Sequence, residues 1–93
     1  MTRYLGQCNV VRRRGAAEEA LWHAMIAAAH PISKATFLRH VDLSPLLDDG
    51  ETAQGFLRTV EASDPDATMY ESMWGHQRCW YLQTSGFEFI FVE

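Results

Sequence analysis

Glutamate, histidine and cysteine are the residue types in this chain that could bind a metal ion or act on a substrate. Glu19 and His23 lie four residues apart in a stretch with helical character, so both project from one side of a helix. His30 follows about three helical turns after Glu19, which is too far along the helix to complete a site with it. A metal site needs a third ligand nearby, so we interpret these residues as a solvated helix face.

The two cysteines offer a second candidate metal site. Cys79 and His76 have two residues between them, a spacing that can span a metal ion, and Cys8 would join them if its strand lay beside theirs. We favour packed free thiols over this site and over a disulfide, because no export signal precedes them. Burial beside Trp80 would raise the pKa of the Cys79 thiol, which disfavours a nucleophilic role. Metal binding by His23, His76 or Cys79 stays an open alternative, and no cofactor is expected.

Other patterns of catalysis and cation binding are weak in this sequence. No serine stands in a nucleophile-elbow pattern, and the sequence contains no glycine-rich phosphate loop. Asp48, Asp49 and Glu51 lack the alternation of a calcium loop, and Asp48 with Glu51 resembles a capping box at the start of a helix. We therefore predict that the protein is not an enzyme.

Charge is distributed unevenly along the 93 residues, whose net charge is −4. Residues 1–40 carry six basic and two acidic residues, whereas residues 41–93 carry two basic and ten acidic residues. This asymmetry suggests a charged partner or self-complementary packing. The basic cluster Arg12, Arg13 and Arg14 could contact phosphates, which makes nucleic-acid binding the alternative function.

The predicted elements place these residues in a mixed helical and stranded domain. Strong helix formers predict a helix that ends before Pro31, and Ser33 is the predicted N-cap of a second helix. Glycine-containing turns at 75–76 and 85–86 predict antiparallel hairpins. In chain order we predict a strand over 3–11, helices over 16–30, 34–40 and 51–62, and strands over 67–74, 77–84 and 87–92.

The predicted fold class is α+β, as a single domain over residues 1–93. Three helices pack on a three- to four-stranded antiparallel sheet, with the last strand between the first and the third. The element order also fits a winged helix, with residues 30–33 as an extended link. In that arrangement the helix over 51–62 would read DNA, but its Glu51 and Glu61 would be repelled by phosphates, so nucleic-acid binding is disfavoured.

The bulk composition bounds the class of protein. With 47% hydrophobic residues the chain is expected to fold, and no apolar run approaches the length of a membrane span. The N-terminal stretch lacks the apolar region of a signal peptide, so we expect a cytoplasmic protein without membrane contact.

Aromatic residues are concentrated in the last three predicted strands. Phe87, Phe89 and Phe91 alternate with Ile90 and Val92, so both faces of the last strand are apolar and need cover. If helices cover one face, a partner is expected on the other. We predict a protein-binding or regulatory module that forms a homodimer and binds an unidentified protein through Tyr70, Trp74, Trp80, Phe87, Phe89 and Phe91. A further alternative is a small-ligand or metal-binding protein with a pocket between Trp22, Trp74 and Trp80.

Overall fold

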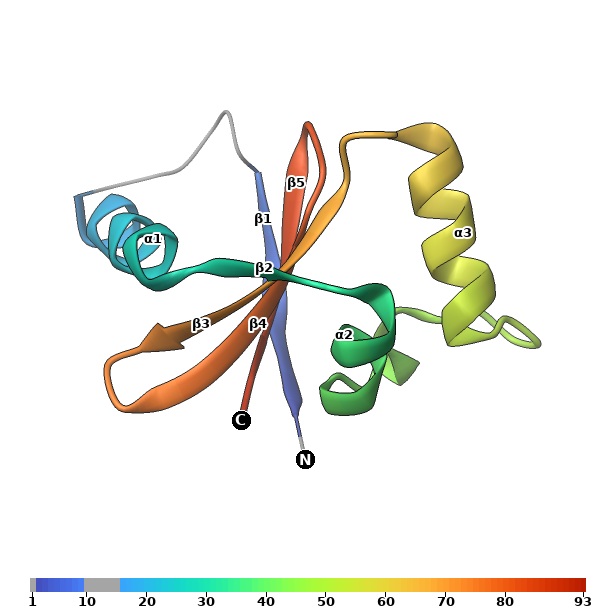
Figure 1. Ribbon diagram of the computed structural model, residues 1–93, viewed down its shortest axis with the longest axis horizontal. Coiled ribbons are helices and arrows are strands. Elements are labelled where there is room, and N and C mark those ends of the chain that lie inside the picture. Colours follow the sequence, from blue (N-terminus) through green and yellow to red (C-terminus); the bar gives the residue numbers. More distant parts are fainter. Residues whose placement is uncertain (1, 10–15) are drawn as a thin grey trace.

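An antiparallel sheet of five strands forms the centre of the protein, in the order β1-β5-β4-β3-β2 (Figure 1). The computed structural model describes residues 2–9 and 16–93. The strands are β1 (Arg3–Asn9), β2 (His30–Ile32), β3 (Thr68–Trp74), β4 (Gln77–Gln83) and β5 (Phe87–Val92). The predicted placement of β5 between β1 and β4 is confirmed.

The prediction of three or four strands missed β2. The sequence predicts that His30 ends a helix, with an extended link over 30–33 in the winged-helix alternative, but these three residues pair antiparallel with β3, with His30 opposite Glu71 and Ile32 opposite Met69. β2 forms one edge of the sheet, where Pro31 is tolerated because its missing N–H need not take part in a ladder.

The helices are α1 (Ala16–Ala28), α2 (Lys34–His40), the short 3₁₀ helix η1 (Ser44–Leu46) and α3 (Ala53–Ser63). Side-chain hydrogen bonds cap the starts of α2 and α3. The predicted cap of α2 is confirmed, since the Ser33 hydroxyl accepts a hydrogen bond from the Thr36 N–H at 3.1 Å. Within the described ranges, no helix is long and apolar enough to cross a membrane.

The start predicted for α3 was wrong by two residues. Thr52 is the N-cap, and its hydroxyl accepts a hydrogen bond from the Gly55 N–H at 3.0 Å. Asp48 and Glu51 close a separate turn before the helix, in which the Asp48 N–H donates to Glu51 Oε1 at 3.1 Å and the Glu51 N–H donates to the Asp48 carbonyl at 3.0 Å. The capping-box pattern therefore identified a real reciprocal contact but not the helix start.

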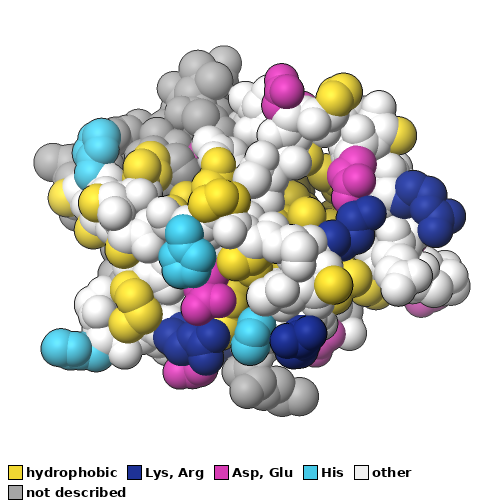
Figure 2. Space-filling view, in the orientation of Figure 1, with side chains coloured by type: hydrophobic (Ala, Val, Ile, Leu, Met, Phe, Trp, Pro, Cys, Tyr) yellow, Lys and Arg dark blue, Asp and Glu magenta, His cyan; other side chains and the backbone are white. Residues whose placement is uncertain are grey.

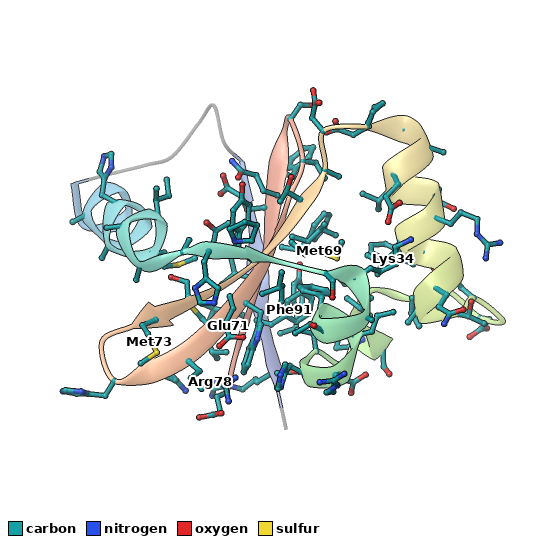
Figure 3. All side chains as sticks on the ribbon, viewed as in Figure 1. Lys34, Met69, Glu71, Met73, Arg78 and Phe91 are labelled. Atoms are coloured by element: carbon teal, nitrogen blue, oxygen red, sulfur yellow. The ribbon has the colours of Figure 1, made fainter. Side chains whose placement is uncertain are left out.

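The helices lie on both sides of the sheet (Figure 1). On one face Met25 of α1 packs with Cys79, Tyr81 and Val92. On the other face α2 and α3 cover a larger core, whose fully buried members include Phe37, Leu57, Trp80, Leu82 and Phe91. Figure 3 shows Met69 and Phe91 on this second side, toward α2. The helices therefore do not form the bundle that the winged-helix alternative requires.

The position of α1 follows from the topology. The chain leaves β1 at one edge of the sheet and enters β2 at the other edge, so the segment between them has to cross a face. α1 makes that crossing and packs against β3. The C-terminal part of β5 is consequently covered on both faces within one chain, with Phe91 and Val92 each 0% exposed. The second chain expected from the sequence is not needed to cover this part of the strand.

Candidate binding site

The aromatic residues predicted to bind a partner do not form one surface. They are Tyr70, Trp74, Trp80, Phe87, Phe89 and Phe91. Tyr70 packs on the α1 side, where its ring stacks on Tyr81 at 4.8 Å, while Trp80 and Phe91 belong to the core beneath α2 and α3. Trp74 pairs through its backbone with Gln77, and its side chain lies outside the described part of the chain.

Trp80 closes the core and is not available to a partner, since it is 2% exposed. The His40 ring stacks on it at 5.4 Å, and the Arg78 guanidinium lies 5.0 Å from the centre of its ring. Arg78 in turn pairs with Glu71 at 3.2 Å and with Glu93 at 3.8 Å, and Figure 3 shows Arg78 beside Glu71. The side chains of Trp22 and Trp74 lie outside the described part of the chain, so the expected pocket between Trp22, Trp74 and Trp80 stays a prediction.

The candidate metal and nucleophile residues lie apart from one another. Within residues 2–9 and 16–93, no group of three His, Cys, Asp or Glu side chains lies close enough to hold a metal ion. His23 and His76 are exposed, whereas Cys79 is 0% exposed. Burial raises the pKa of the Cys79 thiol, and a hydrogen bond with Ser72 opposes that shift only in part. Cys79 is therefore a packed thiol rather than an activated nucleophile.

The basic cluster of the nucleic-acid alternative, Arg12, Arg13 and Arg14, lies outside the described residues. Of the two glutamates expected to repel phosphates from this helix, Glu51 lies before the start of α3, and Glu61 pairs with Lys34 of α2 at 2.9 Å. Nucleic-acid binding remains an untested prediction.

A groove lies between the C-terminal end of α3 and the turn that joins β4 to β5, near the top of Figure 1. Its volume is about 400 Å³. The lining residues are Thr59, Val60, Ser63 and Asp64 from α3 and its cap, and Thr84, Ser85, Gly86, Phe87 and Phe89 from the hairpin. We call this site the α3–hairpin groove.

The floor of the α3–hairpin groove is aromatic. Phe89 is partly buried and meets the Phe56 ring edge-to-face, with the two ring centres 6.3 Å apart. Phe87, the first residue of β5, is 42% exposed. Two of the six residues predicted from the sequence, Phe87 and Phe89, thus meet at one concave site, and the helix cover ends at Phe87.

Asp64 fixes the width of the groove because it joins the two walls. The Ser85 N–H donates to Asp64 Oδ2 at 2.6 Å, and the Asp66 N–H donates to Asp64 Oδ1 at 3.1 Å. These bonds, the one from Ser85 foremost, lower the pKa of the Asp64 carboxyl from its usual 3.8. The carboxylate is therefore ionised at neutral pH and holds the hairpin turn against the end of α3.

The turn itself is held by its own hydrogen bonds. The Thr84 N–H donates to the Phe87 carbonyl at 2.8 Å, and the Thr84 hydroxyl accepts from the Phe87 N–H at 3.0 Å. Both walls of the groove are thus fixed before any partner arrives, which lowers the entropy cost of binding.

Sequence reasoning missed the α3 wall. Residues 63–66, "SDPD", predict only the end of a helix, and the contact between Asp64 and Ser85 joins positions 21 residues apart.

Comparisons of the chain with protein-family models, with curated proteins and with solved structures found no match.

Proposed function

We propose that the protein is a non-enzymatic protein-binding module that accepts an apolar side chain of its partner in the α3–hairpin groove. The observation that carries the proposal is the exposed Phe87 ring beside Phe89 and Val60 in a preformed groove. Aromatic residues in concave, partly desolvated sites are typical binding hot spots.

The chemistry of the groove favours binding over catalysis. Among the described lining residues Asp64 is the one ionisable group, and both of its carboxylate oxygens already accept backbone hydrogen bonds. A general base works best with a pKa near the working pH, and the hydrogen bonds to Asp64 lower its pKa away from that range. The other polar lining groups are hydroxyls of serine and threonine, which can orient a partner's backbone.

The proposed function keeps the protein partner predicted from the sequence but moves it from a sheet face to the end of one strand. The homodimer predicted from the sequence rested on an uncovered sheet face, and α1 removes that reason. Self-association is therefore a separate question, answered by light scattering after size exclusion.

A displayed library of random peptides, selected on the whole protein, tests the proposal. We expect the selected peptides to share an apolar position and to lose at least about tenfold in affinity for Phe87→Ser, as at a hot spot. Met73→Ser is the matched control, because Met73 is 40% exposed on the opposite hairpin and Phe87 is 42% exposed. The affinity of Met73→Ser for the selected peptides should stay within about twofold of wild type, a surface effect of a few tenths of a kcal/mol.

Two outcomes would overturn the proposal. Peptides that bind both variants equally well would place the binding site elsewhere. Failure to select any peptide, combined with amide shifts at Ser85 and Phe87 when small aromatic fragments are added, would make the groove a small-molecule site instead.

A further inference from the structure

We propose that the partner segment carries arginine or lysine next to the apolar side chain that enters the α3–hairpin groove. This inference rests on the proposed function and specifies the chemistry of the partner. Three features favour such a partner: the end of α3, the carboxylates at and beside the mouth of the groove, and the remaining hydrogen-bonding capacity of Asp64.

The C-terminal end of α3 gives the groove a negative wall. Its eleven residues run from Ala53 to Ser63, and the last turn carries no basic residue to offset the helix dipole. The aligned peptide dipoles place about half a negative charge at such an end. The wall formed by Val60, Ser63 and Asp64 therefore attracts a cation.

Acidic side chains add to this potential, and no basic side chain of the lining segments opposes it. Residues 59–66 and 84–89 include Glu61, Asp64, Asp66 and Glu88 but no lysine or arginine. Glu61 is paired with Lys34, and Glu88 is 0% exposed on the other face of β5. This leaves Asp64 at the mouth of the groove, with the exposed Asp66 next to it, since the Asp66 N–H donates to Asp64. Figure 2 shows acidic atoms at the upper edge of the described surface with no Lys or Arg beside them, whereas at the right and lower parts acidic and basic side chains lie next to each other.

Asp64 can bind a guanidinium without giving up its structural contacts. Each of its oxygens accepts one backbone hydrogen bond. The Ser85 side chain bonds to the carboxyl as well. An ionised carboxylate has about four acceptor positions, so about one remains for a partner. An arginine at this point would also lie close to the exposed Phe87 ring, where a cation–π contact is favourable. An apolar residue flanked by basic residues therefore matches the floor and the mouth of the groove together.

Three synthetic peptides of equal length test the inference, each with one central phenylalanine and with flanks of arginine, glutamine or glutamate. Their binding to the whole protein is measured by fluorescence anisotropy at low and at high salt. We expect the arginine-flanked peptide to bind about tenfold more tightly than the glutamate-flanked one at low salt, with the two affinities converging as salt screens the charges.

Charge variants identify the residues responsible. Asp66→Asn removes a charge beside Asp64 and keeps the backbone bond from the Asp66 N–H. It should lower the preference for arginine flanks two- to fivefold, about the effect of one exposed ion pair. Asp64→Asn should lower the preference as well. Asp49→Asn, the matched control at the opposite end of α3, should leave it unchanged.

The outcomes separate this inference from the proposed function. Equal binding of all three peptides, still lost in Phe87→Ser, would overturn the basic partner and leave the groove as a binding site. Binding of none of them, at either salt concentration, would overturn both. A dimer in sedimentation experiments that Phe87→Ser dissociates would assign the groove to a second copy of the chain and overturn the basic partner segment.

Discussion

Phe87, Phe89 and Phe91 alternate along β5, yet alanine at each position should affect stability very differently. Phe91 is 0% exposed, with the Tyr4 ring centre 5.3 Å and the Phe37 ring centre 6.1 Å away. Its removal leaves a closed cavity and should cost about 3–5 kcal/mol. Phe87 is 42% exposed. At about 1.5–3 kcal/mol for complete burial of such a side chain, its partial burial contributes roughly 1 kcal/mol. Phe89, half-buried against Phe56, should fall between them.

Urea unfolding followed by tryptophan fluorescence measures this gradient, with the free energy of unfolding extrapolated to water. If Phe91→Ala does not fold, Phe91→Leu against Phe87→Leu gives the same comparison with smaller losses. The loss of peptide affinity should follow the opposite order, with the largest loss for Phe87→Ala. A Phe87→Ala loss as large as that of Phe91→Ala would refute the reasoning, because it would mean that the start of β5 is packed and the groove is closed.

Three further predictions concern a carboxylate, a thiol and a helix cap. The backbone bond from Ser85 lowers the pKa of Asp64 below 3.8, so the Asp64 contact stabilises the fold above that pH and is lost as the pH falls through the lowered value. Asp64→Asn should remove this acid dependence, read from hydrogen exchange of the Ser85 amide; unchanged acid dependence would contradict it. In Cys8→Ser, Cys79 should react with a thiol reagent only as fast as the protein opens, because the thiol is 0% exposed and burial raises its pKa; immediate reaction in the native state would disprove its burial. Ser33→Ala should cost about 1 kcal/mol in urea unfolding through loss of the α2 cap, and a neutral result would show that the cap bond does not contribute.

Local features of the fold were predictable from the sequence because they depend on neighbouring residues. The Ser33 cap needs only the Thr36 N–H three residues away. The turn at Gly75 needs only a glycine at its first position, where φ is +62°, a value that suits a two-residue hairpin loop. The prediction that β5 lies between β1 and β4 followed from hairpin geometry and from the two apolar faces of β5.

The features that were missed depend on contacts between distant segments. β2 has three residues with a proline at its centre, so nothing in its own composition marks it as a strand, and it exists through its pairing with β3. The groove is a feature of the same kind. Val60 meets the hairpin only because α3 lies over β5, and the lock between Asp64 and Ser85 has no local sequence signal.

The two apolar faces of β5 required cover, and the chain supplies it by crossing the sheet with α1 and returning along the other face with α2 and α3. Helical cover is shorter than the strands, so apolar side chains remain exposed where strands run past it. Two such positions are Met73 near the end of β3, at 40%, and Phe87 at the start of β5, at 42%. Met73 lies opposite Arg78, whose guanidinium is already paired with Glu71. Phe87 instead lies in a groove with a preformed wall and a negative mouth. Equal exposure therefore has different consequences at the two positions, and the groove at Phe87 is where binding should be sought first.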